Sequence, residues 1–199
     1  MRYAIIGSGK AGQALATAFA RKGLEVAIAS RRPAEALAPV AKAIGQTIIP
    51  ESLQDAVKAD IIVLAIPLGT QKEVAKAAES WQGKIVIDVT NAYGVAPEGL
   101  GNLPSSVVIS QAFLGAKLVK AFNSLSAEVL AQDPNVQGGK RVVFLSSDDA
   151  GGAAQVAALV EQLGFAPVQL GKLAEGGLLI QARGKTWAQL IFQDLVEFQ

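Results

Sequence analysis

The chain has 199 residues, of which 51% are apolar and 18% are charged, so it is long and apolar enough to bury a sizeable core without disulfides or metals. Its 18 basic and 17 acidic residues give a formal net charge of +1, which argues against a nucleic-acid partner. The sequence contains neither cysteine nor histidine, so we expect no thiolate or His metal site and no Ser-His-Asp or Cys-His mechanism.

The first half of the chain alternates short β-branched runs with alanine-rich helical stretches. Near-continuous apolar runs such as Ile61–Leu64 are typical of parallel strands that are covered on both faces. The expected strands are Tyr3–Ile6, Glu25–Ala29, Thr47–Ile49, Ile61–Ala65 and Lys84–Val89, and the expected helices are Gln13–Lys22, Ala34–Ile44, Ser52–Ala59 and Gly69–Ser80. This rhythm predicts an α/β fold with a doubly wound, mostly parallel Rossmann sheet and right-handed crossovers.

The second half is less regular. Asn91–Pro104 is rich in turn residues and predicts a loop, and Ser105–Leu114 has strand propensity but fits the topology better as a short helix. The elements expected after it are a strand at Leu118–Phe122, a helix at Ser126–Ala131, a strand–helix–strand unit at Arg141–Leu145, Ala150–Leu163 and Pro167–Leu170, and a mostly helical tail at Leu173–Phe198 that breaks at Gly176-Gly177 and Gly184.

No linker is long enough to separate two domains. We therefore expect a single domain over residues 1–199, with the nucleotide-binding Rossmann core in residues 1–145. Residues 146–199 are expected to form a small C-terminal helical extension that completes the same globule and contributes to dimerisation or to the substrate site. Core packing, dimerisation and partner docking are all open as roles for the helical apolar spacing of Trp187, Leu190, Ile191, Leu195 and Val196, with core packing its commonest meaning.

A glycine-rich turn, Gly7-Ser8-Gly9-Lys10-Ala11-Gly12, lies directly between the first expected strand and the first helix. In that context Gly7 permits the tight turn, Gly9 leaves room for a pyrophosphate, and Gly12 lets the helix pack closely on the strand. The helix N-terminus then offers unpaired N–H groups to the phosphates. The turn predicts a dinucleotide site; the alternatives are a flexible loop without a nucleotide and, for Lys10, a solvated side chain.

The residues after the second strand indicate which dinucleotide is bound. An NAD site places an acidic residue about 20 residues beyond the glycines, to accept hydrogen bonds from the ribose. Here Ser30 stands 18 residues after Gly12, Arg31 and Arg32 follow it, and no acidic residue comes before Glu35. A hydroxyl and guanidinium groups suit a 2′-phosphate, so we expect NADP(H); a solvated arginine pair is the alternative.

Three further loops belong at the same sheet edge. Ala65-Ile66-Pro67 either borders the cofactor ribose or only ends the fourth strand, and Asn91 either holds the nicotinamide carboxamide or forms a turn. Lys120 and Asn123 are substrate-site candidates after the sixth strand, although capping the next helix is the favoured role for Asn123. Asp148-Asp149 are expected to begin the helix at Ala150. These residues supply no clear catalytic group.

Neither a signal peptide nor a membrane span is expected. The apolar run at the start of the chain stops at Gly7, and Lys10 interrupts the stretch that a signal peptide needs. The longest later apolar run, Ile61–Leu68, is far too short to cross a bilayer. We therefore expect a cytoplasmic protein that does not contact membranes.

With these motifs in hand, the chain resembles the NADPH-dependent deazaflavin reductases, the NADP oxidoreductase coenzyme F-420-dependent family and its bacterial relatives. The resemblance rests on Gly7–Gly12, Ser30-Arg31-Arg32, Asp88-Val89-Thr90-Asn91, Val119-Lys120-Ala121-Phe122-Asn123, Leu163-Gly164-Phe165 and Leu173-Ala174-Glu175-Gly176-Gly177. The first two motifs also fit the cytosolic domain of STEAP-type metalloreductases and the N-terminal domain of pyrroline-5-carboxylate reductases.

The resemblance implies a homodimer that transfers hydride between NADPH and a deazaflavin. It implies that Ser8, Ser30, Arg31 and Arg32 hold NADP and that Ile66-Pro67 and Asn91 border the nicotinamide. Leu178 stands where relatives often have arginine, which weakens the expectation of a long anionic coenzyme tail. A flavin or another small planar hydride acceptor is therefore kept beside the deazaflavin. A non-catalytic NADPH sensor and a reductase of small imines or ketones, with Tyr93 or Lys120 as proton donor, are the alternatives.

Overall fold

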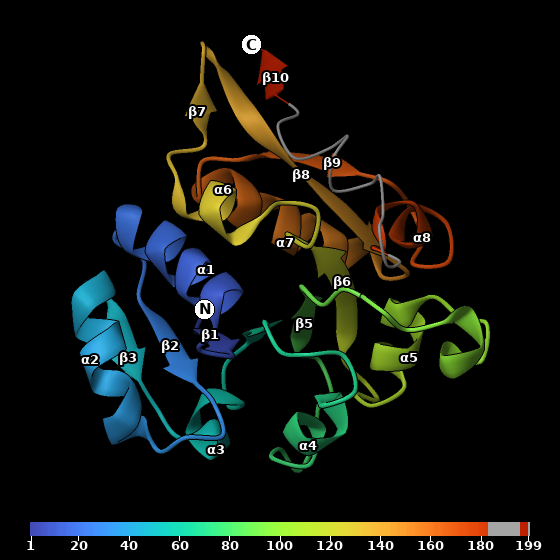
Figure 1. Cartoon of the computed structure of the whole chain (residues 1–199), viewed down its shortest axis with the longest axis horizontal. Helices are drawn as coiled ribbons and strands as arrows, with labels where there is room; N and C mark the ends of the chain where they lie inside the picture. Colours follow the sequence, from blue (N-terminus) through green and yellow to red (C-terminus); the bar gives the residue numbers. More distant parts are fainter. Residues whose placement is uncertain (183–195, 199) are drawn as a thin grey trace.

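The computed structural model describes residues 1–182 and 196–198 (Figure 1). Its strands are β1 (Tyr3–Ile6), β2 (Val26–Ala29), β3 (Ile48–Pro50), β4 (Ile61–Leu64), β5 (Ile85–Asp88), β6 (Lys117–Ala121), β7 (Asn135–Val136), β8 (Gly139–Ser147), β9 (Ala166–Gln169) and β10 (Val196–Phe198). Its helices are α1 (Lys10–Arg21), α2 (Ala34–Ile44), α3 (Leu53–Ala56), α4 (Gln71–Ala75), α5 (Ser105–Ser110), α6 (Ala127–Ala131), α7 (Ala150–Gln162) and α8 (Gly176–Ile180), with a 3₁₀ turn at Pro97–Leu100.

One sheet carries the described strands, in the order β10-β8-β6-β5-β4-β1-β2-β3, and β7 and β9 also pair with β8. The strands from β3 to β6 are all parallel, whereas β8 runs antiparallel to β6. The strand order reverses between β1 and β4, which makes this the switch point where ligands of doubly wound sheets bind. The predicted α/β Rossmann sheet is therefore confirmed.

Two hydrophobic layers cover the sheet because its buried strands are apolar on both faces. Along β4, Ile61 and Val63 pack in one layer while Ile62 and Leu64 pack in the other. The first layer includes residues of α1, α6 and α7, and the second includes residues of α3, α4 and α5 (Figure 1). The helices thus hold both faces of the sheet and leave the loops at its carboxyl edge free to form a site.

The predicted elements of the first half are confirmed, with shifted ends. Helix α1 begins at Lys10 rather than Gln13, directly after the glycine turn. Helix α4 ends at Ala75 rather than Ser80, and Trp81 Nε1 then donates to the Ala75 carbonyl, 2.9 Å away. The ambiguous segment after the loop forms the short helix α5, as the topology favoured.

The C-terminal prediction was wrong in two places. The Gly176-Gly177 pair does not break the tail but opens α8, and Val196–Phe198 forms strand β10 on the edge of β8 instead of a helix. A side chain at Gly176 would place a Cβ 2.3 Å from the Leu170 carbonyl oxygen, so close packing selects glycine there. The predicted break at Gly184 and the apolar spacing from Trp187 to Leu195 lie outside the described residues.

The expected boundary between the Rossmann core and the C-terminal extension can be compared with the observed strands. The boundary at residue 145 falls inside β8, which continues to Ser147 and pairs with β6. The expected strand–helix–strand unit is present as β8–α7–β9, and its two strands pair in parallel. The Rossmann sheet therefore extends past the point where the core was expected to end.

Candidate functional site

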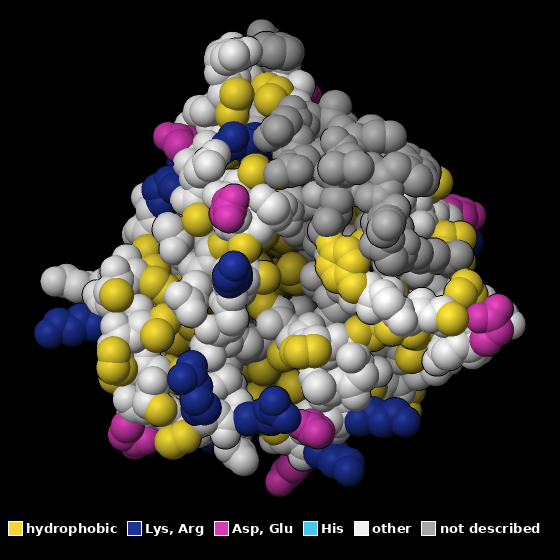
Figure 2. Space-filling model, in the orientation of Figure 1, with side chains coloured by type: hydrophobic (Ala, Val, Ile, Leu, Met, Phe, Trp, Pro, Cys, Tyr) yellow, Lys and Arg dark blue, Asp and Glu magenta, His cyan; other side chains and the backbone are white. Residues whose placement is uncertain are grey.

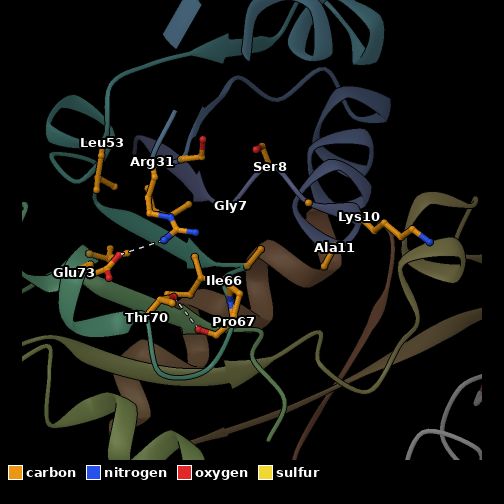
Figure 3. Close-up of a pocket in the computed structure, with 15 residues that line it drawn as sticks. Gly7, Ser8, Lys10, Ala11, Arg31, Leu53, Ile66, Pro67, Thr70 and Glu73 are labelled. Carbon is orange, nitrogen blue, oxygen red and sulfur yellow. Dashed lines mark hydrogen bonds and ion pairs between the residues drawn. The ribbon is translucent and has the colours of Figure 1, made fainter. Parts of the chain in front are cut away.

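A cavity of about 370 Å³ opens at the switch point, beyond the carboxyl ends of β1, β2 and β4. Figure 2 shows this face hollowed near its centre, with apolar side chains in the hollow and charged side chains around it. The described lining residues come from four successive loops and the helices after them: Ile6, Gly7, Ser8, Gly9, Lys10, Ala11, Ser30, Arg31, Leu53, Ala65, Ile66, Pro67, Thr70, Glu73 and Val74 (Figure 3).

The three glycines of the turn have different surroundings. Gly7 has a φ of +124°, and a Cβ there would lie 2.1 Å from the Ala65 carbonyl oxygen. A Cβ at Gly12 would lie 1.9 Å from the Gly7 carbonyl oxygen. A Cβ at Gly9, in contrast, would meet nothing within 4 Å. Gly7 and Gly12 are therefore required by the fold itself, whereas the open space at Gly9 fits a group that enters from outside.

The N-terminus of α1 points its free backbone donors toward this space. Gly9 is the N-cap residue, no side chain caps the helix, and the first turn contains no acidic residue. Uncapped N–H groups and the positive end of the helix dipole form a site for an anion such as a pyrophosphate. The residues present therefore fit a dinucleotide. Lys10 also lines the cavity, but in Figure 3 its side chain extends away from the other lining residues.

Ser30, Arg31 and Arg32 connect the loop after β2 with the glycine turn. The Arg32 backbone N–H donates to Ser30 Oγ (3.1 Å), and Arg32 Nη2 donates to Ser8 Oγ (3.0 Å). Ser30 and Arg31 line the cavity. Arg32 contacts the glycine turn through its hydrogen bond to Ser8. The structure therefore links Ser30 to the Arg32 backbone and the Arg32 guanidinium to Ser8, while their shared binding of one phosphate stays a prediction.

Glu73 is a lining residue that sequence reasoning missed. Its Oε2 lies 3.9 Å from Arg31 Nη1, across the cavity from the loop after β2 (Figure 3), and 80% of the Arg31 side chain and 62% of the Glu73 side chain are exposed. Such an exposed pair contributes little to folding, so the main effect of Glu73 is on the charge that a ligand meets. The signal was its place in the first turn of the helix that follows Ala65-Ile66-Pro67.

The rest of the described lining is mostly apolar. Ala65, Ile66 and Pro67 form it together with Leu53 and Val74, which sequence reasoning also missed. Thr70, a further missed residue, donates its hydroxyl to the Pro67 carbonyl oxygen at 2.8 Å and so fixes the loop. An apolar lining beside a glycine turn and an uncapped helix N-terminus suits the base and ribose of a nucleotide.

Asn91 and Asn123 form a reciprocal pair at the ends of β5 and β6. Asn91 Nδ2 donates to the Asn123 carbonyl oxygen (2.9 Å), and Asn123 Nδ2 donates to Asn91 Oδ1 (3.1 Å) and to the Ile180 carbonyl oxygen (2.7 Å). The favoured capping role of Asn123 was wrong, because Ser126 is the N-cap of α6. Neither asparagine lines the described cavity, and their assignments to nicotinamide and substrate stay predictions.

Lys120 is fully buried. Its ammonium group donates to Asp88 Oδ2 (3.1 Å) and to the Thr90 carbonyl oxygen (3.0 Å). Contact with a substrate stays a prediction, and these bonds use two of the three ammonium donors inside the protein. Burial raises the pKa of Tyr93, so its hydroxyl stays protonated at neutral pH, and the residue is 48% exposed. Asp149, as predicted, is the N-cap of α7.

The switch-point cavity, the strand–glycine turn–helix geometry and the arginine-bearing loop after β2 define a Rossmann-type dinucleotide-binding protein. Among the described residues, no group of three or more His, Cys, Asp or Glu is placed to hold a metal ion, and no helix is long and apolar enough to cross a membrane. The family model of the NADP oxidoreductases, coenzyme F420-dependent, matches residues 2–92. The chain belongs to this family of NADP-dependent oxidoreductases, and the resemblance stated from the sequence is confirmed.

Solved structures extend the similarity over the whole chain. A hypothetical protein from Sinorhizobium meliloti is 37% identical, with a TM-score of 0.89 over 100% of this chain and 96% of that one. A candidate F420-dependent NADP-reductase from Arthrobacter sp. FB24 is 28% identical, with a TM-score of 0.72 over 87% and 86% of the two chains. A reductive aminase from Aspergillus terreus in complex with NADPH, at 18% identity and a TM-score of 0.61, shares the fold.

Curated relatives are longer proteins. Metalloreductase STEAP3 of Rattus norvegicus is 29% identical over 87% of this chain and 34% of its own length, and metalloreductase STEAP2 of Mus musculus is 31% identical over 85% and 33%. The chain thus spans about a third of the length of the curated relatives it matches.

Proposed function

We propose that the protein is an NADP(H)-dependent oxidoreductase that transfers hydride between NADPH and a deazaflavin, a flavin or a similar planar acceptor. The observation that carries the proposal is the bond from Arg32 to Ser8, which places the arginine-bearing loop on the glycine turn beside an uncapped helix N-terminus. The deazaflavin is supported by the description of the family and of the Arthrobacter structure. The metalloreductase relatives support a wider range of acceptors.

Each part of the cavity has a role in this proposal. The first-turn N–H groups of α1 bind the pyrophosphate, and Gly9 leaves the space for it. Ser30 donates a hydroxyl to the 2′-phosphate, and Arg31 and Arg32 supply charge-assisted hydrogen bonds to it. The apolar side chains of Ile66 and Pro67 exclude water from the cofactor.

The protein supplies orientation rather than acid–base chemistry. When bound, the dihydronicotinamide is the hydride source, and the chain holds it against the acceptor. The Lys120 ammonium is occupied by Asp88 and Thr90. Ala65, Ile66 and Pro67 follow β4, the strand next to β5, and none of these three lining residues has an ionisable side chain. A planar acceptor that takes its proton from water fits this arrangement better than an imine or a ketone.

Arg31→Ala and Ser30→Asp test the cofactor assignment. Each should weaken NADPH binding by about 10- to 100-fold, the size of one or two lost hydrogen bonds to a charged group, and should leave NADH binding nearly unchanged. Calorimetry with both nucleotides measures the difference. Lys42→Ala removes an exposed positive charge that does not line the cavity and is the matched control. Equal losses for NADPH and NADH would show that the phosphate pocket is misassigned.

The acceptor is tested by NADPH oxidation with a deazaflavin, FMN and a quinone, followed at the absorbance of the reduced nicotinamide. Turnover with at least one of these planar acceptors, and none with a small imine or ketone, is the expected result. Tight NADPH binding without turnover of any acceptor would replace the reductase by the sensor alternative.

A further inference from the structure

A buried polar network lies beyond the cavity, at the carboxyl ends of β5 and β6. The Asp88 carboxylate is fully buried and accepts three hydrogen bonds: from the Thr90 N–H (2.9 Å), from Ser106 Oγ (2.6 Å) and from the Lys120 ammonium (3.1 Å). Burying two charges costs free energy that their attraction only partly returns. A buried, hydrogen-bonded ion pair at this depth therefore calls for a role beyond stability.

The pair fixes one short piece of backbone. The Thr90 N–H donates to Asp88, and the Thr90 carbonyl oxygen accepts from Lys120 at 3.0 Å, so both backbone polar groups of Thr90 are held by side chains. The next residue is Asn91, whose side chain makes two hydrogen bonds to Asn123. The ion pair thus determines where the turn carrying Asn91 lies.

The topology places this turn on the nicotinamide side of the site. The described cavity holds the loops after β1, β2, β3 and β4, and a dinucleotide that starts there crosses the switch point toward β5 and β6. An asparagine amide offers two N–H donors and an oxygen with two lone pairs. After its bonds to Asn123, Asn91 keeps one donor and one lone pair, the combination that a carboxamide pairs with.

We propose that the Asp88–Lys120 pair is a positioning device that holds Asn91 for the nicotinamide carboxamide, an inference that rests on the proposed NADP(H) function. Lys120 itself does not touch the cofactor; it acts through Thr90 and Asn91. The network ends at the tail, where Asn123 donates to the Ile180 carbonyl oxygen and Gln181 Oε1 accepts from the Ser105 N–H at 2.6 Å. The position of α8 and that of Asn91 are therefore linked.

The test compares two ligands: NADPH and 2′-phospho-ADP-ribose, which lacks the nicotinamide. The variant is the double substitution Asp88→Asn with Lys120→Met, because removing both charges avoids an unpaired buried charge. Calorimetry should show NADPH binding about tenfold weaker, the loss of one well-placed hydrogen bond, and 2′-phospho-ADP-ribose binding unchanged. Ser146→Ala is the matched control, since Ser146 pairs with Lys120 in the strand register and its hydroxyl has no hydrogen-bond partner among residues 1–182 and 196–198.

Asn91→Ala completes the design. This variant should bind NADPH about tenfold more weakly, as the double variant does. Adding the double substitution to it should not weaken NADPH binding further, because the pair acts through Asn91. If the double variant does not fold, Ser106→Ala, which removes one donor to Asp88, should still weaken NADPH alone. Equal losses for both ligands, or additive losses with Asn91→Ala, would reduce the network to a structural role. A wild-type protein that binds neither ligand would overturn the proposed function instead.

Discussion

At the scale of single residues, the glycines of the turn separate the demands of folding from those of binding. Gly9→Ala should leave the melting temperature unchanged, because a Cβ there meets nothing within 4 Å, yet it should weaken NADPH binding by filling the space for the pyrophosphate. Gly12→Ala should destabilise the fold by about 1–3 kcal/mol or more through overpacking against Gly7. Thermal unfolding and calorimetry on both variants check the contrast, and similar losses of stability would contradict it.

Glu73 sets the charge at the same end of the cavity. Under the proposed function, its carboxylate would compete with a 2′-phosphate for Arg31, 3.9 Å away, so Glu73→Gln should tighten NADPH binding several-fold at low salt and leave NADH binding unchanged. Screening should reduce the gain as the ionic strength rises. Titrations at two salt concentrations measure it, with the exposed Glu79→Gln as the control. A weaker NADPH complex would instead give Glu73 a direct ligand contact.

The site residues that the sequence predicted share one property: each belongs to a local motif. The glycine turn and Ser30–Arg32 are contiguous runs whose chemistry can be judged without knowing their neighbours. Glu73 and the Asp88–Lys120 pair could not be found in this way. Their meaning arises only when α4 meets the loop after β2, and when β5 and β6 align Asp88 with Lys120 in register.

At the scale of elements, the strands were predictable because continuous apolar runs have few alternatives in an α/β chain. The tail was not, since α8 depends on Gly176 packing against Leu170, and β10 depends on an edge that β8 offers from far along the chain. The spacing of apolar residues in the tail contains no information about Leu170 or about the edge of β8. The low helix propensity of the two glycines predicted a break, but tertiary packing stabilises a helix there.

Helix α7 gives a prediction at this scale. The Asp149 side chain accepts a hydrogen bond from the Gly152 N–H at 2.6 Å and caps the helix. Asp149→Ala should therefore lower the free energy of unfolding by about 1 kcal/mol without changing the affinity for NADPH, because α7 does not line the described cavity. Urea denaturation and calorimetry test the two halves of the statement. A weakened NADPH complex would show that the start of α7 acts on the site.

At the scale of the whole molecule, cofactor binding should increase the free energy of unfolding. A ligand that binds only the folded state adds about 2.7 kcal/mol at a hundred times its dissociation constant. NADPH should therefore raise the melting temperature more than NADH at equal concentration, and Arg31→Ala should remove most of that difference. A thermal-shift series with both nucleotides measures this. Equal shifts in the wild type would contradict discrimination at the 2′ position.

The cavity has one property with a wider consequence: every described residue that lines it precedes Ala75. The lining of this cavity is therefore encoded in one contiguous stretch, while Asn91 and the elements that would meet a second substrate come later. Under the proposed function, the residues after this stretch are the ones to exchange when a different electron acceptor is sought. The same logic suits chimeras, in which the first 74 residues of one chain are joined to the remainder of a relative.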